Sequence, residues 1–297
     1  MSTQHPSLSE LRNDGSDAVD GSLPTIAPVR VLRLDRDTLS AAEDQVIEEV
    51  PVALVYNGIS HAVLLATPEH LADLALGFSL SEGILGRRQE LYDVDIKSGC
   101  QGIEVHLEIA TSRFAALKER RRTLAGRTGC GLCGVESLEA VARPGAVVNR
   151  GQAIAPAAVA RALATLPEYQ ALHRITGAVH GAAWVDATGR ILQLREDVGR
   201  HNALDKLLGW IARQSLDPTT GFLLVSSRAS YEMVQKAASQ GIGCLVAISA
   251  PTALAVRLAE EHNVTLAGFA RGQRLVVYSH GEYLLDGAVQ TAAGREH

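Results

Sequence analysis

The chain has 297 residues, of which 46% are hydrophobic, 21% charged and only 4% aromatic. This composition is typical of a globular protein whose core is built from aliphatic residues and alanine. The net charge of −5 offers no overall field that would attract nucleic acid, and no apolar run is long enough to span a bilayer. Four cysteines, only two of them close together, do not form a disulfide framework, so we expect a reduced, cytoplasmic protein.

The N-terminal half is predicted to be rich in strands. Residues 1–27 are dominated by Ser, Asp, Gly and Pro without apolar periodicity, which predicts a disordered lead. Apolar alternation then predicts strands, the first of them half-buried, at residues 29–34, 52–56, 62–65 and 103–109. Asn57-Gly58 favours a hairpin turn, and a helix is expected from residue 68 or 69 to about residue 82. We assign residues 28–155 to this strand-rich part.

After about residue 156, continuous apolar runs alternate with amphipathic stretches. Buried strands are expected at residues 222–225, 244–248, 264–267 and 275–278, and helices at 201–214, 231–240 and 252–262. Asn202 is expected to cap the first of these helices, and Gly241 to end the second. The alternation predicts a mixed α/β domain with a partly parallel sheet over residues 156–297.

Cys130 and Cys133 form a Cys-x-x-Cys motif surrounded by glycines. Glycine lets a loop bend and lets another molecule approach, so the sulfurs are expected to be available for chemistry. A structural zinc site is disfavoured because it needs four ligands, and Cys100 and Cys244 are distant in sequence. Two functions remain open from the residues alone: disulfide exchange at the start of a helix, and carriage of sulfur as a persulfide.

Three polar segments follow strands in the second half. Residues 195–202 and 226–230 each join a strand to a helix, which is where α/β folds place ligand sites. In residues 268–274, Phe269 suits stacking on a base, and Arg271 and Arg274 suit phosphate oxygens. Helix caps, a surface ion-pair cluster and a basic hairpin turn are the alternative interpretations. His180, which lies among small residues, is a secondary candidate.

Four segments in this order resemble the FdhD family: CGLCG (130–134), EDVGRHNALDK (196–206), SSRASYEMVQK (226–236) and SAPTALAV (249–256). These proteins are sulfurtransferases that formate dehydrogenase needs in order to become active. The resemblance implies a homodimer with a layered fold similar to that of cytidine deaminases. It also implies that sulfur passes from a cysteine desulfurase to the molybdenum or tungsten of the bis-molybdopterin guanine dinucleotide cofactor, which binds transiently as the substrate, with no permanent metal.

The resemblance also assigns roles to residues. Cys130 would carry the persulfide, and Cys133 matches the second loop cysteine, whose role stays open. The family's cofactor-binding segment would correspond to Phe269, Ala270, Arg271, Gly272, Gln273 and Arg274. The sequence does not decide whether four further residues line the same cleft: His180, Asp197, His201 and Arg228.

Two rival functions are weighed against sulfur transfer. A zinc deaminase needs His-x-Glu followed by Pro-Cys-x-x-Cys, whereas Gly181 and Ala182 follow His180 and the Cys-x-x-Cys lies upstream. The other rival is a non-catalytic chaperone that binds and delivers the molybdenum cofactor, with Cys130 and Cys133 as contacts. A persulfide on Cys130 would distinguish the carrier from the chaperone.

Overall fold

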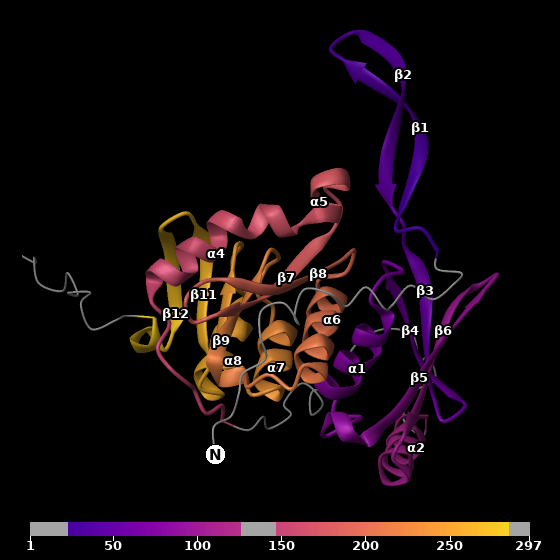
Figure 1. Cartoon of the computed structure of the whole chain (residues 1–297), viewed down its shortest axis with the longest axis vertical. Helices are drawn as coiled ribbons and strands as arrows, with labels where there is room; N and C mark the ends of the chain where they lie inside the picture. The colour runs from indigo at the N-terminus through magenta and orange to yellow at the C-terminus, as the bar shows by residue number, and fades with distance from the viewer. Residues whose placement is uncertain (1–22, 126–146, 285–297) are drawn as a thin grey trace, which may run out of the picture.

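The computed structural model describes residues 23–125 and 147–284. In these ranges the chain forms a two-stranded arm, a four-stranded sheet and a six-stranded sheet (Figure 1). Most of the predicted lead and the whole Cys-x-x-Cys motif lie outside the described residues. No helix in the described ranges is both long enough and apolar enough to cross a membrane.

The six-stranded sheet has the order β12-β11-β10-β9-β7-β8. Its strands are β7 (His180–Asp186), β8 (Ile191–Asp197), β9 (Gly221–Val225), β10 (Cys244–Ala247), β11 (Thr265–Arg271) and β12 (Arg274–Ser279). Strands β9, β10 and β11 pair in parallel, while β8 and β9 both pair antiparallel to β7. The ends of β8, β9, β10 and β11 therefore lie along one side of the sheet, which we call the carboxyl edge.

Helices cover both faces of this sheet (Figure 1). They are α4 (Pro156–Tyr169) and α5 (Ala171–Thr176) on one side, and α6 (Arg200–Arg213), α7 (Tyr231–Ser239) and α8 (Ala253–Glu261) on the other. Strand β9 shows how the two cores divide, because Phe222 and Leu224 pack with α4 whereas Leu223 and Val225 pack with α6 and α7. The predicted mixed α/β class is confirmed.

Residues 147–155 run along this larger part of the molecule. Val148 N–H donates to the His262 carbonyl (2.9 Å), and Ile154 N–H donates to the Tyr283 carbonyl (2.8 Å). Three short 3-10 helices complete the described elements: Arg88–Glu90, Pro218–Thr220 and Gly281–Tyr283. The α/β core thus begins before residue 156, where the sequence pattern changes.

The predicted cap of α6 is wrong. The helix begins at Arg200 with Gly199 as its N-cap, and Asn202 lies inside the first turn. The Asn202 side chain instead donates to the Leu65 carbonyl (2.7 Å) and to Asp197 Oδ1 (3.0 Å), because the tertiary contact is available there. The predicted stop of α7 is confirmed, with Gly241 in the left-handed region at φ 72°.

The four-stranded sheet has the order β4-β3-β6-β5. Its strands are β3 (Val50–Tyr56), β4 (Ile59–Ala66), β5 (Leu91–Gly99) and β6 (Gly102–Ile109), and its helices are α1 (Leu71–Ser81) and α2 (Thr111–Ala125). Asn57 and Gly58 both have positive φ, as the predicted hairpin between β3 and β4 requires. The apolar side chains of one sheet face pack with α1, which leaves the other face uncovered by the helices of this part.

Helix α1 joins the two sheets by packing directly on α6. A Cβ added to Gly77 would lie 1.7 Å from the Asp205 carbonyl oxygen, and one added to Gly209 would lie 1.9 Å from that of Asp73. The two helix backbones therefore touch, and only glycine fits at these two positions.

The arm consists of β1 (Ile26–Asp35) and β2 (Thr38–Ile47) and extends away from the body of the molecule (Figure 1). Its first strand begins at Ile26, and the predicted strand at residues 29–34 lies within it. The prediction that this strand is half-buried is wrong for its outer half, where residues 32–35 are all exposed. The apolar side chains change face between Val31 and Leu32: Val29 and Val31 are partly buried, whereas Leu32 and Leu34 meet no core.

Candidate functional site

Two of the predicted polar segments meet at the carboxyl edge. His180, the first residue of β7, pairs in register with Asp197, the last residue of β8. On the other side of β7, Gly181 N–H donates to Ser226 Oγ (2.8 Å) and Ser226 N–H donates to the Gly181 carbonyl (2.9 Å). The segments that begin α6 and α7 thus flank the start of β7.

Backbone hydrogen bonds extend this edge to the remaining segments. Ala229 N–H donates to the Ala250 carbonyl (3.3 Å), and Thr252 N–H donates back to the Ala229 carbonyl (3.0 Å). Phe269 N–H in turn donates to the Ser249 carbonyl (3.2 Å). Residues that are distant in sequence are therefore held in one continuous row of loops.

Phe269 has an unusual conformation in this row. Its backbone lies in the left-handed region at φ 50°, and its ring is exposed. Such a backbone is costly for a bulky residue and concentrates at functional sites. Just before it, a Cβ on Gly268 would lie 2.8 Å from Pro251 Cδ, so glycine is needed for the close approach of β11 to the loop after β10.

The predicted turn at residues 268–274 is shorter than expected. Strand β11 continues to Arg271 and β12 begins at Arg274, so that only Gly272 and Gln273 form the turn. Arg271 and Arg274 pair in register, and both side chains are exposed. Ala270 differs from its neighbours because its side chain is buried in the core, so only its backbone could reach a ligand.

His201 links the two helices at the edge. Its Nε2 lies 2.7 Å from Glu232 Oε2 on α7, and this ion-pair contact lowers the pKa of Glu232. His180 is half-buried, and its burial, together with the charge of Arg200, lowers its pKa, which keeps the ring neutral near pH 7. Arg228, the remaining candidate among the histidines and arginines named from the sequence, is exposed.

Three buried polar atoms at this edge make no hydrogen bond within the described chain: Arg200 Nε, Ser230 Oγ and His201 Nε2, the last of which only approaches the Glu232 carboxylate as an ion pair. Ser230 is the N-cap residue of α7, but its hydroxyl makes no capping bond. Together with the N–H groups at the starts of α6 and α7, these donors suit an anionic ligand.

Asp197 does not belong to the exposed site. Its carboxylate is fully buried and lies 2.6 Å from Lys206 Nζ. It also accepts hydrogen bonds from the backbone N–H groups of Thr67 (3.1 Å) and Gly199 (2.8 Å). Burial lowers the pKa of Lys206, against the opposing charge of Asp197. This ion pair has a structural role, and it ties β8 and α6 to the segment before α1.

Two further buried carboxylates were not predicted. Asp73 on α1 accepts hydrogen bonds from Arg195 (2.7 and 3.0 Å) and from Arg213 (3.0 Å). Asp205 on α6 accepts from Lys236 on α7 (2.9 and 3.0 Å). We call these three carboxylates and their basic partners the buried seam. One signal in the sequence could have indicated this seam: Asp73 is the only charged residue in the apolar run 71–80, and a buried charge requires a partner.

Ser81 and Glu82 at the end of α1 complete the seam. Ser81 Oγ donates to Asp205 Oδ1 (2.7 Å), and Lys236 Nζ donates to Glu82 Oε1 (3.0 Å). Burial alone would lower the pKa of Lys236, but Asp205 and Glu82 outweigh it and raise the pKa. The ammonium group therefore stays charged between α1, α6 and α7.

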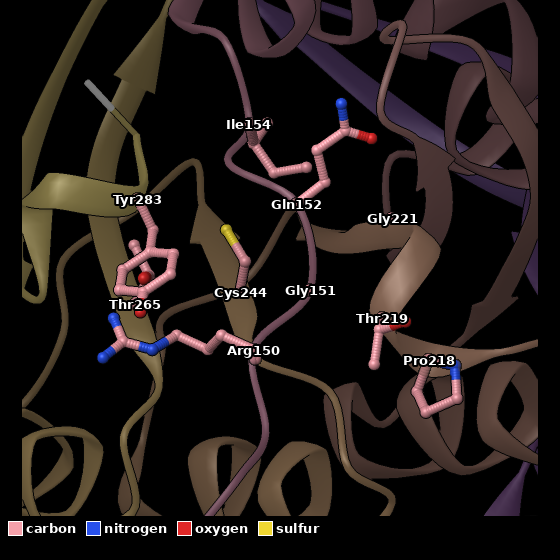
Figure 2. A pocket seen from close by; sticks show the side chains of 11 residues that line it. Arg150, Gly151, Gln152, Ile154, Pro218, Thr219, Gly221, Cys244, Thr265 and Tyr283 are labelled. Carbon is pink, nitrogen blue, oxygen red and sulfur yellow. The ribbon is translucent and has the colours of Figure 1, made fainter. Parts of the chain in front are cut away.

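Cys244 lies at the opposite edge of the sheet, where β10 begins (Figure 2). Its thiol faces a pocket of about 20 Å³, and burial raises its pKa to about 12. In the same pocket wall, the Arg150 guanidinium lies 3.5 Å from the centre of the Tyr283 ring. A thiol with so high a pKa is not a nucleophile at neutral pH, so Cys244 is a poor sulfur carrier.

Cys100 is exposed, between β5 and β6. Cys130 and Cys133 lie outside the described residues. Across residues 23–125 and 147–284, no three His, Cys, Asp or Glu side chains are grouped as metal ligands would be.

Comparison with known proteins places the chain in a family. It is 55% identical to the sulfur carrier protein FdhD of Cupriavidus necator, over 90% of this chain and 93% of that protein. It is 54% identical to the Bordetella bronchiseptica protein of the same name, over 86% and 94%. The fold matches the crystal structure of a proposed formate dehydrogenase accessory protein from Desulfotalea psychrophila, with a TM-score of 0.69, 21% identity and coverage of 88% and 100%. Residues 47–285 match the model of the FdhD/NarQ family, to which this chain belongs.

Proposed function

We propose that this protein carries sulfur in the maturation of formate dehydrogenase. It accepts sulfur from a cysteine desulfurase as a persulfide on Cys130, and it transfers this sulfur to the molybdenum or tungsten of bis-molybdopterin guanine dinucleotide. The cofactor is the substrate, and the protein acts in the cytoplasm as a homodimer. Support comes from the relatives at 54–55% identity, which are named as sulfur carrier proteins.

The observation that carries the proposal is the exposed group Phe269, Arg271 and Arg274 at the carboxyl edge. An exposed aromatic ring suits stacking on guanine, and paired guanidinium groups suit a diphosphate. The strained backbone of Phe269 supports a functional role for the ring. These residues belong to the segment that resembles the family's cofactor-binding segment.

Cys130 is the best candidate for the carrier by motif and by elimination. Cys244 is buried with a raised pKa. Cys100 has no second cysteine close in sequence, and glycine precedes it but does not follow it. In the proposed transfer, the bond between Cys130 Sγ and the outer sulfur breaks, and Cys130 leaves as a thiolate that takes up a proton. The outer sulfur is delivered at the sulfane level and bonds to the reduced metal of the cofactor, whose two-electron oxidation converts this sulfur to sulfide. Cys133 either assists this release or positions the sulfur.

Mass spectrometry tests the proposal directly. The full chain is incubated with a cysteine desulfurase and cysteine, and the peptide that contains Cys130 is expected to gain the mass of one sulfur atom. Cys130→Ser should abolish both this gain and the activation of formate dehydrogenase, whereas Cys100→Ser should leave both unchanged. Absence of sulfur from both Cys130 and Cys133 of the wild-type chain would refute the carrier function.

The same experiment separates the carrier from a non-catalytic chaperone for the molybdenum cofactor. A chaperone would bind and deliver the cofactor without ever holding a persulfide. If Cys130→Ser keeps guanine nucleotide binding but cannot activate the dehydrogenase, the chaperone alone is insufficient. If that variant still activates the dehydrogenase, the chaperone replaces the carrier as the function.

A further inference from the structure

Phe269 lies in a bulge of strand β11. Gly268 pairs in register with Val276 of β12, and the next registered pair along the two strands is Arg271 with Arg274. Between these pairs, two residues of β11 stand opposite one residue of β12, which defines a β-bulge. Bulges re-aim a side chain and are common beside functional sites.

The bulge turns the Phe269 ring outward. Successive side chains of a regular strand point to opposite faces, so Ala267 and Phe269 would share one face. Ala267 packs in the core beside α4, and Ala270, three residues later, packs in the same core. The extra residue therefore shifts the alternation by one position. Ala270 fills the core, and Phe269 is left 52% exposed at the carboxyl edge.

Phenylalanine is an unusual residue for this position of a bulge. With φ at 50°, the backbone of Phe269 lies in the left-handed region, which glycine adopts readily and a bulky residue adopts only at a cost. Such a conformation persists only where the surrounding structure imposes it. The contacts that impose it come from the loop after β10.

The loop at residues 249–251 supplies these contacts. Phe269 N–H donates to the Ser249 carbonyl (3.2 Å). Directly before it, a Cβ on Gly268 would lie 2.8 Å from Pro251 Cδ and 3.1 Å from the Ser249 carbonyl oxygen. The φ of Gly268 is not positive, so glycine is required there for this close contact and not for the backbone conformation.

The same loop is fixed to the start of α7. Pro251 forms a parallel bridge with Ala229. In this bridge, Ala229 N–H donates to the Ala250 carbonyl (3.3 Å), and Thr252 N–H donates to the Ala229 carbonyl (3.0 Å). Because Ala229 is fully buried, the loop rests on the core and can hold Phe269 in place.

We propose that residues 249–251 and Gly268 are positioning residues, which hold the Phe269 ring in the orientation in which it stacks on the guanine base. They act through Phe269 and need no contact with the ligand themselves. This inference rests on the proposed function, in which Phe269 takes the base and Arg271 and Arg274 take the diphosphate. It gives a role to the start of the segment SAPTALAV, to which sulfur transfer itself assigns none.

Calorimetry of the full chain with two ligands tests the positioning role. Guanosine diphosphate carries both the base and the diphosphate, whereas inorganic pyrophosphate carries no base. Phe269→Ala and Gly268→Ala should each lower the affinity for guanosine diphosphate about tenfold, because stacking of the base on the ring is lost in both. Neither variant should change the affinity for pyrophosphate, which also shows that the variants are folded.

The double variant separates positioning from general damage to the site. If Gly268 acts through the ring, Gly268→Ala should cause no further loss of affinity once Phe269 is replaced by alanine. An additive loss would overturn the positioning role. Gly99→Ala is the matched control, because an added Cβ there lies at an ordinary contact distance of 3.6 Å from its nearest neighbour, and it should leave both affinities unchanged.

Pro251→Ala approaches the same contact from the other side. Removing Pro251 Cδ makes room for the added methyl group, so Gly268→Ala combined with Pro251→Ala should bind guanosine diphosphate more tightly than Gly268→Ala alone. Pro251→Ala by itself loosens the contact and should lower this affinity about threefold, with pyrophosphate binding unchanged. Where Gly268→Ala fails to fold, Pro251→Ala decides alone, and an unchanged affinity overturns the proposal.

The outcomes separate this inference from the function. If Phe269→Ala weakens the binding of guanosine diphosphate and Gly268→Ala does not, the positioning role is refuted and the binding site stands. If Phe269→Ala changes nothing, or if the wild type binds no guanosine diphosphate, the ring is not a base contact and both the site and its positioning are refuted. Sulfur transfer is decided independently by the persulfide measurement.

Discussion

The buried seam and the carboxyl edge share one sequence segment, residues 195–206, but its charged side chains are buried and paired in the seam and partly exposed at the edge. Within residues 195–206, Arg195, Asp197 and Lys206 point into the protein and are fully paired. Arg200 and His201, from the same segment, lie at the partly exposed edge. One charged motif can therefore supply both structural ion pairs and side chains available to a ligand, and the burial of each side chain, not its residue type, decides which.

The energetic consequences differ in the same way. A buried ion pair contributes little compared with an apolar pair, but removing one partner is costly because the other charge stays buried. At the exposed edge, solvent replaces a lost charge, so substitution there should change binding and leave stability almost unchanged.

The largest effect is expected from breaking the seam. Lys236→Met leaves the Asp205 carboxylate buried without its basic partner, and we expect a loss of about 3–5 kcal/mol in the free energy of unfolding. Urea denaturation at neutral pH measures this value. Lys118→Met is the matched control, because the same change at an exposed lysine of α2, which among the described residues contacts only the Phe114 ring, should cost at most about 1 kcal/mol.

A second substitution tests whether the cost comes from the stranded carboxylate. Combining Lys236→Met with Asp205→Asn removes the charge that the single variant strands, so the double variant should regain part of the lost stability. If the double variant is less stable than the single one, the seam does not act through paired charge.

His70, the N-cap residue of α1, lies beside the seam and should make the free energy of unfolding depend on pH. Burial, together with the charges of Arg195, Lys206 and Arg213, lowers the pKa of His70 from 6.5 to about 3. Below pH 6.5 the unfolded chain therefore binds a proton that the folded chain does not. Stability should fall by about 1.4 kcal/mol per pH unit from pH 6.5 toward the folded-state pKa.

His70→Asn should remove this contribution. Asparagine tolerates the left-handed backbone of this N-cap position, where φ is 55°. Unfolding free energies of both chains at about pH 7, 6 and 5 give the comparison, in which the variant should lose less stability on acidification. Parallel curves for the two chains would show that His70 is protonated equally in both states.

The smallest effect on stability is expected at the edge. Replacing Arg271 and Arg274 together with alanine should change the free energy of unfolding by less than about 0.5 kcal/mol, because both side chains are exposed. Affinity for a guanine nucleotide, measured by calorimetry, should nevertheless fall about tenfold or more with loss of both charge-assisted contacts. Unchanged affinity would remove this segment from the proposed binding site.

Local patterns predicted most of the elements near these two regions. Apolar runs identified β9 and β10 because both strands are buried on two faces, and Asn57-Gly58 identified a hairpin because its turn requires positive φ. Of the site, the sequence predicted the segments that meet at the carboxyl edge, since they follow strands of one sheet.

Pairing across long sequence separations could not be predicted. Arg195 and Asp73 are 122 residues apart, and nothing in either segment identifies the other as its partner. The exclusion of Asp197 from the site depends on the same long-range contacts, through the segment around Thr67. Strand β2 was missed because its sequence does not alternate, so its extended form depends on pairing with β1.

The contact between Gly77 and Gly209 has a mechanical consequence. Sliding α1 along α6 would drive a carbonyl oxygen of either helix into the side chains that flank the glycine of the other. The two helices can therefore pack in only one register along their axes. The four-stranded sheet that packs on α1 and the six-stranded sheet that packs on α6 should therefore move together as one body.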